Sequence, residues 1–161
     1  GPQSVILTLT ANAAYTLGST FGSFLDVQTL PTTGAYAVLV DPGAAYTGTA
    51  AVTLYDVPAD ASGSVTINGT VLRVTLTAPG QNAQISFPGS AGQAVTVRGV
   101  NSSMSCVNVF LIQSNGTVTS TSPCTPSYSL SVRLSATGTH TIKVDPQAAN
   151  MGAVDLSVTS P

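Results

Sequence analysis

The feature that most constrains the fold is an internal repeat. An offset of 104 residues carries Leu30 onto Leu134, and between residues 30 and 48 it gives nine identities in nineteen positions without a gap. Chance gives about one identity over such a length, so the two ends of the chain are copies of one structural unit. The nine residues of the first copy are Leu30, Thr33, Gly34, Val40, Asp41, Pro42, Ala44, Ala45 and Gly48.

The repeat extends in both directions beyond this stretch. The same offset carries Val5 onto Val109 and Leu54 onto Val158, so the match spans whole strands. Roughly residues 61 to 108 have no counterpart upstream, and the chain has the order second half, first half, second half. We expect residues 1–57 to be the C-terminal half of a first β-sandwich repeat, residues 58–69 a connector, and residues 70–161 a complete β-sandwich domain.

Short strand patterns separated by turn clusters dominate the last hundred residues. The expected strands are 71–77, 82–87, 94–100, 107–113, 117–121, 128–135, 138–144 and 153–158. Apolar residues alternate with Ser, Arg, Thr and Lys in several of them, which is typical of antiparallel strands with one buried face. With no helical periodicity, the pattern predicts an all-β, antiparallel two-sheet sandwich of jelly-roll or Greek-key type, one complete unit plus a preceding half unit.

The composition excludes several classes of protein. Charged residues make up only 6% of the chain and hydrophobic residues 43%, with a formal charge of −2, which favours a folded chain over a disordered one. Three arginines and one lysine leave no basic face for phosphates, so we expect no nucleic-acid partner. No apolar run of 18 residues occurs, so we expect no membrane-spanning helix, and no charged leader opens the chain.

The two cysteines flank a predicted hairpin. Ser114-Asn115-Gly116 is a usual three-residue hairpin loop, and if Gln113 pairs with Thr117 the same register places Cys106 directly opposite Cys124. We therefore expect a disulfide, which would indicate an oxidising compartment; the alternative is two independent buried thiols. The offset places Thr20 at the position of Cys124, so no second bridge is expected in the first copy.

Candidate catalytic residues are few. A serine-histidine-aspartate arrangement needs a histidine base, and the only histidine, His140, lies inside a predicted strand, where the repeat places Tyr36 in the first copy. A ring at this position indicates a sheet-face residue rather than a base. The chain has no glutamate, so an acid/base pair would have to come from aspartates alone. We expect no enzymatic activity and no catalytic residues.

Four aspartates are candidate calcium ligands. Asp41 and Asp145 belong to the repeated Val-Asp-Pro, where an aspartate can cap the turn that the proline begins, and this structural role is the favoured interpretation. Asp56 and Asp60 lie four residues apart on the expected connector. Calcium takes six to eight oxygens and usually several carboxylates, so we expect no metal site and no cofactor, with calcium kept as the alternative.

Aromatic residues that could bind a sugar are limited to tyrosines and phenylalanines, because the chain has no tryptophan. Tyr46 and Tyr55 are the candidate ligand-binding residues, and Tyr15 and Tyr128 are further ones. Tyrosines in strands more often pack against the sheet than bind ligands. A polysaccharide partner is therefore an alternative rather than the first expectation.

Four segments of the second copy carry a family resemblance: Pro79–Phe87, Ala91–Val97, Val107–Gly116 and Leu134–Pro146. They resemble bacterial pre-peptidase C-terminal (PPC) domains, most of all the tandem relatives in large secreted or surface proteins, including those with Rhs-type repeats. The resemblance covers residues 70–161 fully and residues 5–57 as a half unit. It implies a non-catalytic β-sandwich appendage, which in some members binds calcium or polysaccharide; this chain lacks their acidic clusters.

The expected function is that of a non-catalytic, extracellular structural or adhesive module, part of a tandem-repeat surface or secreted protein exported by a bacterial-type route. Its expected partners are other copies of the same repeat or chain. The first alternative is a self-assembling extracellular filament subunit joined by β-strand donation, because residues 1 to 60 lack the strands that should complete their sandwich. The further alternative is a carbohydrate-binding module.

Overall fold

The computed structural model describes residues 3–9, 16–20, 23–42 and 47–161, with side chains from residue 16 onward. The chain divides into two compact units, unit 1 from Gly1 to Tyr55 and unit 2 from Asp56 to Pro161. All regular elements in the described residues are strands, and none of those residues forms a helix long and apolar enough to cross a membrane.

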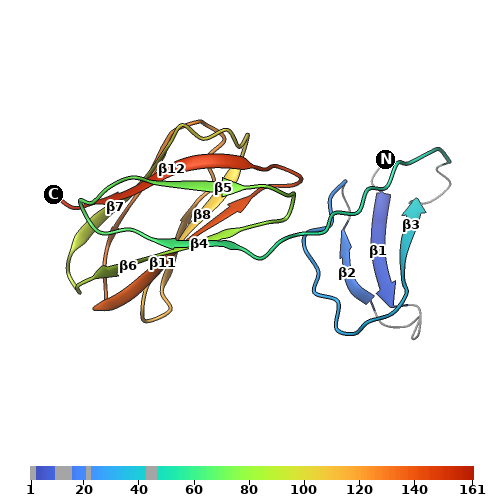
Figure 1. Ribbon diagram of the computed structural model, residues 1–161, viewed down its shortest axis with the longest axis horizontal. Coiled ribbons are helices and arrows are strands. Elements are labelled where there is room, and N and C mark those ends of the chain that lie inside the picture. Colours follow the sequence, from blue (N-terminus) through green and yellow to red (C-terminus); the bar gives the residue numbers. More distant parts are fainter. Residues whose placement is uncertain (1–2, 10–15, 21–22, 43–46) are drawn as a thin grey trace. The chain divides into compact units, whose positions relative to one another are not determined.

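Unit 2 is a sandwich of two sheets (Figure 1). One sheet has the order β4-β6-β11-β8-β9, with β4 (Ala61–Ser64), β6 (Ala83–Gly89), β11 (Gly138–Pro146), β8 (Val107–Ile112) and β9 (Val118–Thr121). The other has the order β10-β7-β12-β5, with β10 (Tyr128–Arg133), β7 (Ala94–Val100), β12 (Gly152–Thr159) and β5 (Leu72–Leu76). All pairings are antiparallel except that of β4 with β6, which confirms the predicted all-β sandwich.

Alternation along the strands builds the core of unit 2. In β11 the side chains of His140, Ile142 and Val144 are buried, while the residues between them are partly exposed. The inner faces of the other strands add Ile85, Phe87, Val95, Val97, Val109, Leu111, Val154 and Leu156, among others, to one continuous apolar cluster. Each such side chain contributes about 1.5–3 kcal/mol when it leaves water, so this core holds the two sheets together.

The expected connector, residues 58–69, takes part in the sandwich. Ala61–Ser64 forms β4, which runs parallel to β6 with Ala61 opposite Ala83, and Val65 is buried in the core. Small residues such as Ala, Ser and Gly have low strand propensity, so the sequence pattern gives no sign of this strand. The pairing with β6, some twenty residues later in the chain, creates it.

Unit 1 contains one sheet with the order β2-β1-β3, formed by β1 (Gln3–Leu9), β2 (Thr16–Thr20) and β3 (Tyr36–Pro42). Val5 of β1 lies opposite Val40 of β3, and 104 residues later Val109 of β8 lies opposite Val144 of β11. The two strand pairs thus have the same register at every position where both are paired. Unit 1 is the copy of the β9-β8-β11 part of the five-stranded sheet.

The first hairpin differs from its copy in length. Val5 and Thr20 are opposite each other 15 positions apart, whereas Val109 and Thr121 are opposite each other 12 positions apart. The first hairpin is therefore three residues longer, and by its pairing Thr20 is the counterpart of Thr121 instead of Cys124, the position that the gapless offset gives it.

Two further strands of the repeat are absent from the described part of unit 1. Residues 24–29 and 48–55 are the counterparts of β10 and β12, yet neither segment is a strand. In unit 2, β7 lies between β10 and β12 and pairs with both. Because β7 belongs to the first half of the repeat, which has no copy in unit 1, these two segments have no strand between them to pair with.

Candidate interaction surface

The predicted disulfide joins Cys106 to Cys124, with their Cα atoms 4.0 Å apart. The hairpin has the register expected from its loop: Gln113 donates its backbone N–H to the Thr117 carbonyl at 2.8 Å, and Val109 lies opposite Thr121. The bridge therefore continues the β8·β9 ladder beyond its last paired residues. It links the residue before β8 covalently to the segment that leads to β10.

His140 has a structural environment. It is fully buried, its Nδ1 accepts a hydrogen bond from the backbone N–H of Ser114 at 3.2 Å, and its ring lies 5.2 Å from that of Phe87. A neutral imidazole with Nδ1 as acceptor carries its proton on Nε2, and Nε2 has no hydrogen-bond partner among the described residues. Among the described residues, neither ring nitrogen is hydrogen-bonded to a side-chain hydroxyl.

The four candidate calcium ligands do not converge. Asp41 and Asp145 lie near the ends of β3 and β11 instead of in a turn, and Asp145 pairs with Lys143 Nζ at 3.3 Å. Asp60 accepts hydrogen bonds from the backbone of Asn82 and the side chain of Gln84, and Asp56 is exposed. Among the residues that the structure describes, no three histidines, cysteines or acidic side chains form a group that could hold a metal ion.

A polar cluster that the sequence pattern did not indicate surrounds Asp155. Its carboxylate accepts hydrogen bonds from Asn101 Nδ2 at 2.9 Å and Arg73 Nη1 at 2.8 Å. Two hydrogen bonds lower the pKa of the Asp155 carboxyl, and the one from Asn101 has a larger effect than the one from Arg73. Both lie on the β12 sheet or its connections, and an ion pair with so exposed an arginine stabilises the fold little.

The tyrosines do not form a platform in the described residues. Tyr46 and Tyr15 lie outside the described residues, and Tyr55 is exposed. The ring of Tyr128 covers Gly99, its cross-strand partner, so closely that a Cβ on Gly99 would overlap it. Burial raises the pKa of the Tyr128 hydroxyl to about 12. Tyr128 is thus a packing residue.

Apolar side chains that the repeat buries in unit 2 are exposed in unit 1. Leu30 is 52% exposed and its counterpart Leu134 is 1% exposed. The pairs Val52 with Leu156 and Leu54 with Val158 have exposures of 53% against 0% and 75% against 1%. Unit 1 therefore presents to solvent the face that the first half of the repeat covers in unit 2.

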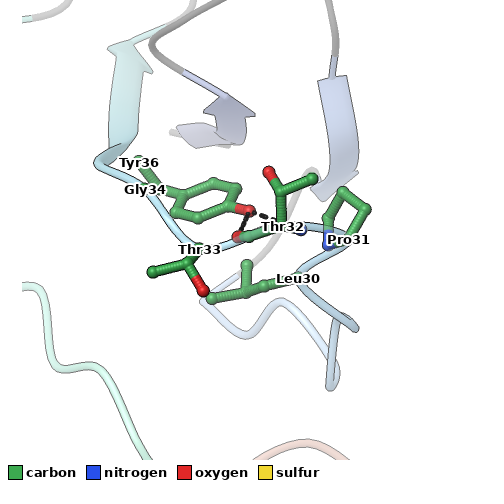
Figure 2. A pocket seen from close by; sticks show the side chains of 6 residues that line it. All are labelled: Leu30, Pro31, Thr32, Thr33, Gly34 and Tyr36. Carbon is green, nitrogen blue, oxygen red and sulfur yellow. Dashed lines mark hydrogen bonds between the residues drawn. The ribbon is translucent and has the colours of Figure 1, made fainter.

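A hollow of about 470 Å³ lies beside β3 in unit 1, and Figure 2 shows the residues that line it. They are Leu30, Pro31, Thr32, Thr33, Gly34 and Tyr36. The Tyr36 hydroxyl donates a hydrogen bond to the Thr32 carbonyl and accepts one from the Thr32 N–H at 3.3 Å, which holds the loop against the ring. The sequence pattern gives no sign of this hollow, although three of its residues belong to the nine repeat identities.

Comparison with known proteins finds structural similarity only. No protein-family model and no curated protein matches the chain. The chain is similar to the pre-peptidase C-terminal domain of collagenase from Bacillus anthracis, with 10% identity over 64% of this chain and 99% of that chain and a TM-score of 0.47. It is also similar to PliG of Aeromonas hydrophila, a periplasmic inhibitor of g-type lysozyme, with 17% identity over 62% and 99% of the chains and a TM-score of 0.42. At this level of similarity, function has to be argued from the residues themselves.

Proposed function

We propose that this chain is a non-catalytic structural or adhesive module of an extracellular or cell-surface protein built from tandem copies of the PPC-like repeat. One observation carries the proposal: Leu54 is 75% exposed in unit 1 whereas Val158, its counterpart, is 1% exposed in unit 2. Leu30 and Val52 are likewise exposed although their counterparts are buried, so these three residues are candidates for an interaction site. Unit 2 acts as a self-contained spacer, and unit 1 connects to another copy of the repeat.

The inaccessibility of the only histidine supports a non-catalytic role. His140 is enclosed by Phe87, the Ser114 loop and Gly89, so no substrate can reach its nitrogens without opening the core. The described aspartates lie apart from one another or are engaged in hydrogen bonds. No cofactor is needed for a spacer, and calcium stays an alternative that addition of EDTA would test through a fall in the melting temperature.

The disulfide supports an oxidising location. A bridge between Cys106 and Cys124 persists outside the cytosol and is reduced inside it, which favours secretion to the cell surface, the medium or the periplasm. Peptide mass mapping of the protein from its native host would check this. Free thiols at both cysteines in freshly isolated protein would contradict the proposed location.

The experiment that tests the structural role is sedimentation velocity of the purified chain, combined with hydrogen exchange. We expect a monomer with strong amide protection in β6, β8, β11 and β12 and weaker protection in β3 and residues 47–55, because unit 1 has no covering half. Equal protection of both units in a monomer would contradict an incomplete unit 1. Hydrolysis of a peptide or glycoside substrate by the chain would contradict the non-catalytic role.

A self-assembling filament is the second candidate, favoured by the position of β3 at the edge of the unit 1 sheet. Residues 1–161, however, contain one first-half segment and two second-half segments. If a chain donated its first half to a neighbour, its own unit 2 would lose the strands β4 to β7. Identical chains therefore gain nothing by exchange, and concentration-dependent polymers in the sedimentation experiment would be needed to restore this candidate.

Carbohydrate binding is supported only by the exposed ring of Tyr55, with Tyr46 as the other candidate. Single rings without a tryptophan bind sugars weakly compared with a platform of several. Pull-down with insoluble polysaccharides tests this candidate. Retention that is lost in Tyr55→Ala would establish a polysaccharide partner in place of another repeat.

A further inference from the structure

The hollow of unit 1 has a counterpart in unit 2 that is filled. The 104-residue offset carries its lining residues Leu30, Thr33 and Tyr36 onto Leu134, Thr137 and His140. In unit 2 this place is taken by the turn between β6 and β7, residues 89 to 93. The turn belongs to the first half of the repeat, the half that unit 1 does not contain.

Three hydrogen bonds seat the turn in unit 2. Gly92 donates its backbone N–H to the Leu134 carbonyl at 2.7 Å, and Leu134 donates its own N–H to the Gln93 carbonyl at 2.9 Å. Ala91 donates its N–H to Thr137 Oγ1 at 2.9 Å. Two of these bonds use the backbone of Leu134, and the third uses the hydroxyl of Thr137. Unit 1 has the same residue types at these two positions, Leu30 and Thr33.

The fit of the turn also depends on a glycine. A Cβ on Gly89 would lie 2.5 Å from Leu134 Cδ1 and 3.1 Å from His140 Cδ2, so only a residue without a side chain allows this approach. In unit 1 the ring at the His140 position is that of Tyr36, which lines the hollow together with Leu30 and lies against the backbone of Thr32 (Figure 2). At the two positions that contact Gly89 in unit 2, unit 1 therefore also has a leucine and an aromatic ring.

The strand register points to the same partner. In unit 2, β6 pairs with β11 on the side away from β8, with Phe87 opposite His140 and Ile85 opposite Ile142. β3 pairs with β1 in the same register in which β11 pairs with β8. The same offset therefore aligns a β6-like strand with β3. Such a strand would place its Phe87 and Ile85 equivalents opposite Tyr36 and Val38.

We propose that unit 1 is an acceptor for a first-half segment from another copy of the repeat, which seats its β6–β7 turn in the hollow of residues 30–36 and pairs its β6 strand with β3. This deepens the proposed structural role and rests on it. The segment would also supply a β7 strand between residues 24–29 and 48–55, which converts both into strands, and would cover Leu30, Val52 and Leu54.

The chain's own first half is not the occupant. Its residues Ile85, Val95 and Val97 are almost completely buried in unit 2, and covalent attachment gives that half a high effective concentration there. A separate copy of the segment has no such competitor at unit 1. The donor must therefore come from a repeat whose first half is not already engaged.

A cysteine cross-link at the predicted register tests the proposal. The full chain carries Leu39→Cys, and a synthetic polypeptide of residues 58–104 carries Gln84→Cys; in unit 2 the equivalent pair is Lys143 opposite Gln84. Leu39 and Gln84 are exposed, and the native cysteines are already bonded to each other. We expect an intermolecular disulfide in a glutathione buffer, at least about tenfold more abundant than with Asp41→Cys, which is exposed and two positions out of register.

Matched controls identify other occupants. The donor with Gly89→Leu should cross-link at least about tenfold less, because its side chain meets the Leu30 wall of the hollow. Cross-linking of the donor to Lys143→Cys at the same level as to Leu39→Cys would mean displacement of the chain's own first half and would overturn the proposal. A disulfide between two copies of the Leu39→Cys chain would indicate pairing of unit 1 with itself and would also overturn it.

A second measurement does not depend on the solubility of the donor. Residues 58–105 are fused directly before Pro2 of the chain, which reproduces the connection into β8, since Pro2 is the counterpart of Cys106 and Gln3 that of Val107. We expect hydrogen exchange in residues 24–42 and 47–55 to slow at least about tenfold relative to the unfused chain. If exchange stays fast and no cross-link forms, the acceptor role is wrong, while a monomeric chain without enzymatic activity would leave the proposed structural function intact.

Discussion

Gly89 and Leu134 lie against each other in unit 2, so that a Cβ on Gly89 would come within 2.5 Å of Leu134 Cδ1. Leu134 is 1% exposed and is held by two backbone hydrogen bonds to the β6–β7 turn, so it has little room to move. This contact joins the last residue of β6, in the first half of the repeat, to the loop before β11, in the second half. The two halves of the repeat are therefore closely packed at this point.

Gly89→Ala should therefore destabilise unit 2. We expect a loss of about 1–3 kcal/mol in the free energy of unfolding, because the added methyl group overpacks Leu134 and His140. Urea unfolding followed by far-UV circular dichroism measures it. Gly48→Ala is the control, since nothing lies within 4 Å of a Cβ there, and an equal effect of both substitutions would contradict the steric explanation.

The same substitution at the two copies of one repeat position should have unequal effects. Leu134→Ala empties a buried site and should cost about 2–5 kcal/mol, whereas Leu30→Ala, at a site that is half exposed, should change stability by less than about 0.5 kcal/mol. Differential scanning calorimetry of both variants checks this. A large effect at Leu30 would mean that unit 1 already buries this face in solution.

Reduction of the disulfide should weaken unit 2. The bridge closes a loop with a sequence separation of 18, for which loop-closure entropy gives about 3 kcal/mol. We expect the melting temperature to fall when a phosphine reductant is added, and the Cys106→Ala, Cys124→Ala double variant to melt at the lower temperature with or without reductant. A reductant effect that persists in the double variant would show that the bridge is not its cause.

Alkaline pH should destabilise unit 2 through Tyr128. Burial raises the pKa of its hydroxyl in the folded state to about 12, while in the unfolded chain it is about 10. The contribution of Tyr128 to the free energy of unfolding is therefore constant below pH 10 and falls as the pH rises toward 12. The difference corresponds to about 2–3 kcal/mol when fully developed. In Tyr128→Phe this loss should be absent, so urea unfolding at pH 8 and pH 11 should show a smaller change in the variant. The same change in both proteins would rule out Tyr128 as the source.

The sequence determined the strands and their local register. All eight strands expected after residue 70 are present, because alternation of apolar and polar residues between turn clusters marks which segments have one buried face. The hairpin loop before Thr117 set the β8·β9 register and with it the cysteine pairing, since the side-chain period of two fixes every later pair once one pair is known. The place of His140 within a strand could likewise be predicted from the sequence.

Only the tertiary structure decided which segments of the chain form strands. Residues 48–55 match β12 in sequence but are not a strand, while Ala61–Ser64 lacks strand propensity and is one. The physical reason is that a strand needs a neighbour for its backbone hydrogen bonds: β12 has β7 beside it and β4 has β6, whereas unit 1 has no β7. The same missing half leaves the hollow at Leu30 and Tyr36 open, and it could be found only by comparing the two copies in three dimensions.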